Sequence, residues 1–255
     1  MLPVVLALAC TPAPAPAAAT LDSALLAVLH APSAAVATAQ VDALAALVDR
    51  EVAPHPEGVR LGVLTAEDLE GLSLDASTDP ARLLGGAQER IVEGTPDQYA
   101  TLVPRSDQSF VGGYARWDRT LVAGDAAGWA DRQPLSAEDE VEKEAPFGIV
   151  LPYALAMDAA WGAHADGTPF TLFRSRAPRA GWSDDGASAV VATLTVELWR
   201  PVGDTRTAWF NATWTQVVTP LGDAATEDFL VGQVLDGAAE VIDGSEAWLR
   251  DGEGP

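Results

Sequence analysis

Two alternating runs followed by an amphipathic segment occupy residues 187–250, and this stretch constrains the fold most. In Val190–Arg200, apolar side chains recur at every second residue, as on a strand with one buried face. Thr205–Val218 shows the same alternation, and Gly203 and Asp204 between the two runs are typical turn residues. The sequence therefore predicts an antiparallel β-hairpin here.

A long helix is predicted to follow this hairpin. Thr226 is a candidate N-cap, and Glu227 and Asp228 place acids in the first turn, where the helix dipole favours them. Apolar residues then recur at three- and four-residue spacing as far as Leu249, which indicates one buried stripe. We expect this stripe to pack on the apolar face of the hairpin.

The alternation also assigns the hairpin side chains to two faces. Trp199 and Trp209 are predicted to point away from the helix and to form an exposed contact patch. The other face is predicted to line any cavity between sheet and helix. The candidate ligand-binding residues on it are Leu194, Val196, Phe210 and Trp214.

The chain is strongly acidic, with 37 Asp and Glu residues against 15 Lys and Arg residues and a formal net charge of −22. A field of this sign repels phosphate backbones, so nucleic acid is not expected as a partner. Ser136–Ala145 holds five acids together with the only lysine, Lys143. This run predicts a solvated loop or an exposed sheet edge.

The N-terminal residues indicate export. Residues 1–9 are apolar, Cys10 is the single cysteine, and a Pro/Ala-rich linker runs to residue 19. This order resembles a bacterial lipoprotein signal, which implies a lipidated Cys10 and a membrane anchor on the periplasmic or outer-surface side. The alternatives are an ordinary signal peptide cut near Ala17–Ala19 and an apolar N-terminus of no consequence.

The remaining chain divides into two predicted regions. Residues 20–85 carry Ala-rich helical patterns and predict a helical extension. Residues 86–252 begin with a strand, continue with a short helix capped by Thr95 and about six strands, one of them Gly128–Leu135, and end in the long helix. An antiparallel sheet with helices on one face is an α+β layout.

This order resembles the START-like superfamily, also called the polyketide-cyclase or SRPBCC group. Three segments carry the resemblance: GGAQERIVEGTPDQYATLV, ELWRPVGDTRTAWFNATW and DFLVGQVLDGAAEVIDGSEAWL. The resemblance implies a helix-grip fold, in which an antiparallel sheet wraps around a long C-terminal helix with a cavity between them. Members of the superfamily bind lipids, sterols, polyketides and other apolar ligands, and some are cyclases or hydrolases. Their catalytic residues differ, so none is assigned here.

Sequence signatures of catalysis are absent. Nucleophile-elbow, zinc-protease, phosphate-loop and dinucleotide-binding patterns do not occur. His30, His55 and His164 have no metal-ligand spacing, so no catalytic residue, metal or cofactor is predicted. His164 has Asp158 and Asp166 nearby in sequence and is a weak candidate for a general base.

These observations predict a membrane-tethered exported protein that binds an apolar small molecule or lipid without catalysis. One alternative is a cyclase- or hydrolase-type enzyme of the same fold, which inward-pointing His, Asp or Arg side chains would favour. The other is an interaction scaffold that has no ligand and binds a protein through the Trp199 and Trp209 face.

Overall fold

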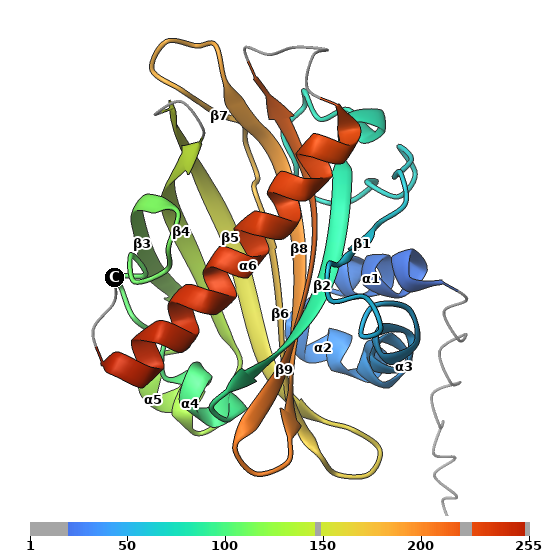
Figure 1. Ribbon diagram of the computed structural model, residues 1–255, viewed down its shortest axis with the longest axis vertical. Helices are drawn as coiled ribbons and strands as arrows, with labels where there is room; N and C mark the ends of the chain where they lie inside the picture. The colour runs from blue at the N-terminus through green and yellow to red at the C-terminus, as the bar shows by residue number, and fades with distance from the viewer. Residues whose placement is uncertain (1–19, 146–148, 220–225, 253–255) are drawn as a thin grey trace, which may run out of the picture.

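The computed structural model describes residues 20–145, 149–219 and 226–252 and shows a large sheet crossed by one long helix (Figure 1). The strand order is β1-β2-β9-β8-β6-β5-β4-β3, with β7 paired to β8 outside this path. All of these pairings are antiparallel. The strands are β1 Val59–Arg60, β2 Leu84–Glu93, β3 Tyr114–Ala123, β4 Leu135–Ala145, β5 Ile149–Ala163, β6 Pro169–Arg176, β7 Gly181–Trp182, β8 Ala189–Val202 and β9 Arg206–Val218.

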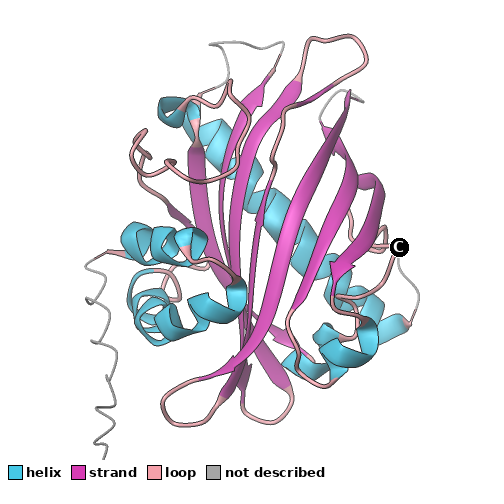
Figure 2. Cartoon of the chain, turned by 180° about the vertical axis from the view of Figure 1, so that it is seen from behind, coloured by secondary structure: helices cyan, strands magenta, loops and turns pink. Residues whose placement is uncertain are grey.

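Helices cover both faces of this sheet. The long helix α6 crosses one face diagonally, and α1 to α3 pack against the opposite face (Figures 1 and 2). None of the described helices is both long and apolar enough to cross a bilayer. The helices are α1 Leu21–His30, α2 Ala34–Ala37, α3 Val41–Glu51, α4 Pro96–Ala100, α5 Ala126–Ala130 and α6 Glu227–Asp251, with short 3₁₀ turns at Thr38–Gln40 and Pro80–Arg82.

The predicted helix-grip architecture is confirmed. Strands β8 and β9 pair antiparallel through a turn at Gly203, which has a φ of 62°. The Thr226 side chain accepts a hydrogen bond from the Phe229 backbone and begins α6 as predicted. The α6 helix then packs along β2 and β9 on the sheet face that we call the grip face.

The predicted helix start at Thr95 is also confirmed. Thr95 accepts a hydrogen bond from the Gln98 backbone, and the Gln98 side chain accepts one from the Thr95 backbone. This reciprocal capping satisfies two backbone donors that the first helical turn leaves unpaired. It holds Tyr99, which is fully buried, beneath the β8–β9 hairpin, where its ring lies 5.2 Å from that of Trp209.

Two local predictions are wrong, and both concern the strands next to the sheet edge. Asp125 caps the short helix α5, so most of Gly128–Leu135 is not strand. The acidic run Ser136–Ala145 is not a loop but lies in β4, between β3 and β5. Glu140 and Glu142 point outward, where Arg116 approaches both, while Asp139 points inward. Because side chains alternate along a strand, the outward-facing acids reach solvent even though the segment is β-strand and not loop.

The N-terminal helices share a hydrophobic core with the outer face of the sheet. A buried ion pair joins them: Arg174 on β6 lies 2.7 Å from Asp158 on β5. Arg174 also donates to the carbonyls of Val28, Leu29 and Ala31 at the end of α1, and Asp158 accepts from the Ala34 backbone at the start of α2. The pair thus complements both helix ends at the α1–α2 turn.

Arg174→Met is expected to lower the free energy of unfolding by about 3 kcal/mol, because it leaves the Asp158 carboxylate without its cation. Urea denaturation measures the change. Arg250→Met is the matched control, since Arg250 pairs with Asp251 at the exposed end of α6 and is expected to matter little. Equal stability of Arg174→Met and wild type would contradict a structural role for the pair.

Candidate functional site

A cavity of about 560 Å³ lies between the grip face of the sheet and α6. It extends from Phe229, which is 46% exposed, to the buried indoles of Trp199 and Trp209. The Phe229 end is therefore the open mouth, and the two tryptophans form the closed floor. Ligand pockets in proteins commonly have volumes of this order.

Three pairs of polar residues line the sheet side of the cavity. Strands β8 and β9 place these residues directly opposite one another, and successive pairs lie about 7 Å apart because side chains on one face recur every second residue. We call the pairs the polar rungs. From mouth to floor they are Thr193 with Thr215, Thr195 with Thr213, and Glu197 with Asn211.

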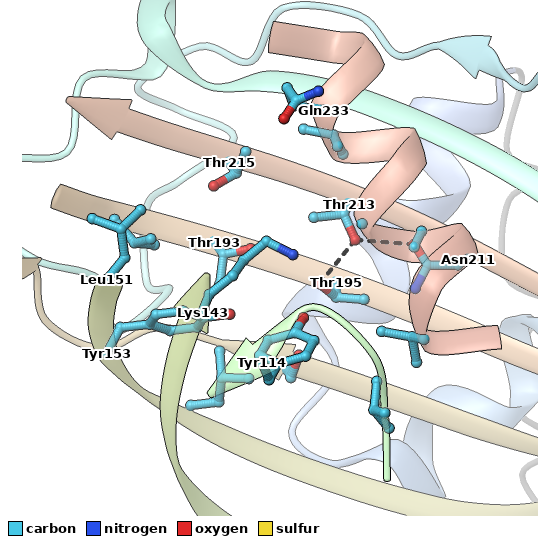
Figure 3. Close-up of a pocket in the computed structure, with 18 of the residues that line it drawn as sticks. Tyr114, Lys143, Leu151, Tyr153, Thr193, Thr195, Asn211, Thr213, Thr215 and Gln233 are labelled. Atoms are coloured by element: carbon cyan, nitrogen blue, oxygen red, sulfur yellow. Dashed lines mark hydrogen bonds between the residues drawn. The ribbon is translucent and has the colours of Figure 1, made fainter. Parts of the chain in front are cut away.

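Hydrogen bonds run from Thr195 through Thr213 to Asn211, toward the floor of the cavity (Figure 3). Thr213 Oγ1 donates to Asn211 Oδ1 at 3.1 Å, and Thr195 Oγ1 lies 3.0 Å from Thr213 Oγ1. A hydroxyl has one proton to donate, so Thr195 must be the donor to Thr213. The Asn211 amide then retains its own donors, and its side chain lowers the pKa of Glu197, its cross-strand neighbour.

The walls opposite and beside the rungs are mostly apolar. Helix α6 contributes one row of side chains and β5 contributes another. The α6 row consists of Phe229, Leu230, Val234, Ala238 and Val241, and the β5 row of Leu151, Tyr153, Leu155 and Met157. A ligand in the cavity would meet the polar rungs on one side and mostly hydrocarbon from α6 and β5 on the others.

An aromatic cluster closes the floor. The ring of Trp199 lies 4.3 Å from that of Phe173 and 4.6 Å from that of Trp209. Tyr99 from α4 packs against both tryptophans and donates its hydroxyl to the Glu93 carbonyl at 2.6 Å. The floor is therefore held in place by packing from both the sheet and α4.

Glu197 is the ionisable group of the polar rungs. Burial raises the pKa of its carboxyl above the ordinary value of 4.5, against smaller lowering effects from the Trp209, Trp199 and Asn211 side chains and from the Arg119 charge. Trp209 Nε1 donates to Glu197 Oε2 at 2.9 Å. The carboxyl faces the cavity from within a ring of dipolar neighbours.

A second buried pair lies beside the floor. Arg119 on β3 and Asp139 on β4 are cross-strand partners, and both guanidinium Nε and Nη2 donate to the carboxylate, at 2.8 and 2.7 Å. Their side chains are only 7% and 1% exposed. Trp117 Nε1 also donates to Asp139, at 2.9 Å, which leaves this pair saturated rather than available to a ligand.

Lys143 also reaches the cavity from β4 (Figure 3). Its Nζ lies 3.7 Å from Glu240 of α6 and 4.7 Å from the centre of the Tyr114 ring. A Cβ at Gly237 would stand 3.1 Å from this Nζ, so glycine there lets the ammonium approach the helix closely. Nearby, burial and the neighbouring Tyr114 hydroxyl raise the pKa of the Tyr153 hydroxyl.

The predicted ligand-binding residues lie on the other face of the sheet. Leu194, Val196, Phe210 and Trp214 are fully buried in the core shared with α1 and α3, and none lines the cavity. The alternation separated the two faces correctly, but it did not show that helices cover both. The face assigned to α6 packs on the N-terminal helices instead, and this placement corrects the prediction.

The predicted exposed patch is also corrected, since Trp199 and Trp209 are 4% and 3% exposed. Trp199 and Trp209, large aromatic residues on the otherwise polar face of the hairpin, were the sequence signal that other elements cover this face. The polar rungs themselves went unrecognised because alternating threonine is equally typical of a solvated strand face.

The other sequence candidates lie outside the cavity. His164 pairs with Asp42 of α3 through its Nδ1, at 2.6 Å, and not with Asp158 or Asp166. Within the described ranges, no group of three His, Cys, Asp or Glu side chains is placed to hold a metal ion. Cys10, the predicted lipidation site, falls outside the described residues.

Comparison with known proteins gives structural likenesses only. No family model matches the sequence, and no curated protein matches it. A STAR-related lipid transfer protein fragment from Xanthomonas axonopodis is similar over 70% of this chain and 99% of its own, at 10% identity and a TM-score of 0.44. The di-domain aromatase/cyclase StfQ of the steffimycin pathway is similar over 86% of this chain and 61% of its own, at 12% identity and a TM-score of 0.42.

A START superfamily protein from Mycobacterium smegmatis is similar over 65% of this chain and 98% of its own, at 12% identity and a TM-score of 0.37. All three TM-scores lie below 0.5, so the description of the site does not depend on these proteins. The antiparallel sheet that grips α6, with a cavity between them, is established by the strand pairings and by the lining residues.

Glu197→Gln is expected to gain stability relative to wild type as pH rises. A raised carboxyl pKa means that the folded protein holds a proton that the unfolded chain releases. The stability that this group contributes is therefore fully present below pH 4.5 and is lost as pH rises through the folded pKa. Glutamine does not titrate and avoids this loss.

Urea denaturation of both proteins at several pH values from about 4.5 to about 8 measures the difference, over the window in which such a group titrates. Glu140→Gln, whose side chain is 75% exposed, corrects for the change in net charge. A Glu197→Gln advantage that stays constant across this range would show that burial does not perturb the Glu197 pKa.

Proposed function

We propose that this protein binds an apolar small molecule or lipid in the cavity between the sheet and α6, without transforming it. The supporting observation is the cavity itself, with three polar rungs on one wall and mostly apolar side chains from α6 and β5 on the others. A wholly apolar ligand would leave Thr195, Asn211 and Glu197 without partners on the cavity side. A ligand with a few hydrogen-bonding groups on an apolar body fits this lining best.

The open mouth and closed floor favour an elongated ligand. The Phe229 end is exposed, whereas the Trp199 and Trp209 end is sealed by α4. A ligand therefore enters along α6 and stops at the aromatic cluster. Its apolar body would lie on Leu230, Val234 and Ala238, which share one side of the helix.

An enzyme of the cyclase or hydrolase type is the second candidate. Arg119, Asp139 and Glu197 point inward, which is the kind of cluster that would favour catalysis. Arg119 and Asp139 neutralise each other, however, and Thr213 donates to Asn211 rather than to a base. Across residues 20–145, 149–219 and 226–252, His30, His55 and His164 bond to Asp68, Glu57 and Asp42 and not to a cavity hydroxyl. Binding without turnover is therefore the preferred proposal.

Val234→Trp is expected to abolish co-purification of a ligand, because an indole there occupies the space between α6 and the polar rungs. Native mass spectrometry of the protein, followed by organic extraction, detects a bound mass. Asp236→Trp, on the exposed side of the same helix, is the matched control and should retain it. If wild type stays free of added mass after incubation with a lipid extract, the proposed function is wrong.

We further propose that the chain is exported and anchored in a membrane through a lipid on Cys10. The apolar residues 1–9, the lone cysteine and the Pro/Ala linker support this proposal. Cys10→Ser is expected to move the protein from the membrane fraction to the soluble fraction of cells that express the full chain. Loss of the lipid mass from the N-terminal peptide should accompany the move. An unchanged distribution would contradict the anchor.

A further inference from the structure

The deep end of the cavity has one more negative charge than positive when Glu197 is ionised. Arg119 and Asp139 cancel, because the guanidinium binds the carboxylate through two nitrogens. No ion pair within 4.0 Å involves Glu197 among residues 20–145, 149–219 and 226–252. An ionised carboxylate buried without a cation is costly, so this site favours the addition of one positive charge.

The neighbours of Glu197 are arranged for a carboxylate. Thr195 donates to Thr213 and Thr213 to Asn211, which is the cross-strand neighbour of Glu197 and lowers its pKa. Trp209 Nε1 donates to it from the floor. These dipoles all favour the ionised form, yet none supplies a full charge, and burial still raises the Glu197 pKa.

The surroundings also suit an organic cation. The rings of Trp199, Trp209 and Phe173 pack together at the floor beside Glu197, and aromatic faces attract ammonium groups. A net charge of −22 raises the local concentration of cations around the protein. Arg119 and Lys143, two cations of the cavity lining, already lie against the carboxylates of Asp139 and Glu240.

We propose that the ligand carries a basic nitrogen, which enters first and binds Glu197 at the floor as an ammonium group. The apolar body then lies along α6 and points toward Phe229. The ammonium supplies the positive charge that the ionised Glu197 carboxylate lacks, so the deep end with its ligand is electrically neutral. This inference rests on the proposed ligand-binding function and narrows it to apolar amines.

Three probes of equal chain length test the inference: decylamine, decanol and decanoic acid. Isothermal titration at about 0.15 M salt, where charges more than about 8 Å apart are largely screened, gives their affinities for wild type, Glu197→Gln and Glu140→Gln. Wild type is expected to bind decylamine at least about tenfold more tightly than decanol, and decanoic acid most weakly. Glu197→Gln should lose the amine preference and retain decanol binding, which also shows that it folds.

The control and the remaining outcomes separate the inference from the proposed function. Glu140→Gln removes the same charge from an exposed position and should keep the amine preference. Decanol or decanoic acid binding as tightly as decylamine to wild type would overturn the amine assignment but leave ligand binding intact. An amine preference that survives in Glu197→Gln would equally overturn it. If none of the three probes binds wild type, the proposed function fails, and the inference fails with it.

Discussion

The antiparallel pairing of β8 with β9 fixes both the core and the cavity. Because side chains alternate along a strand, one register places Glu197 opposite Asn211 on the grip face and Leu194 opposite Trp214 on the outer face. A slip of one residue would send the polar rungs into the apolar core beneath α1 and α3. Burial of the outer face therefore specifies the register that builds the polar wall of the cavity.

Two largely buried ion pairs link separate elements of the fold. Arg174 and Asp158 join the α1–α2 turn to the outer face of the sheet, and Arg119 and Asp139 join β3 to β4 beside the cavity floor. Each pair is bonded to further backbone or indole groups, which compensates for the water that burial removes. Among the described residues Glu197 has no such ion pair, and its carboxylate accepts a hydrogen bond from the Trp209 indole instead.

Local sequence signals predicted much of the fold. The β8–β9 hairpin, the cap at Thr95 and the start of α6 at Thr226 each depend on residues close in the chain, so their chemistry is readable without the structure. The acidic run in β4 was misread because its composition was weighed above its alternation. The inward positions Asp139 and Lys143 there were consequently missed.

The candidate site was not predictable in the same way. Alternation separates two faces of a strand but does not say which helix covers which face, because that depends on contacts between distant segments. Residues 20–51 cover the face that was assigned to α6, so Phe210 and Trp214 belong to a dry core and the threonines face the cavity. Trp199 and Trp209, large aromatics on the polar face, were the signal that should have been weighed more heavily.

A crystal structure of the protein grown with decanol would show whether the space between the polar rungs and α6 admits an apolar chain. Elongated density is expected from the aromatic floor toward Phe229, with the Leu194 and Trp214 face closed beneath α1 and α3. An interior in which α6 packs directly onto Thr195 and Thr213, leaving no space for a ligand, would contradict this expectation.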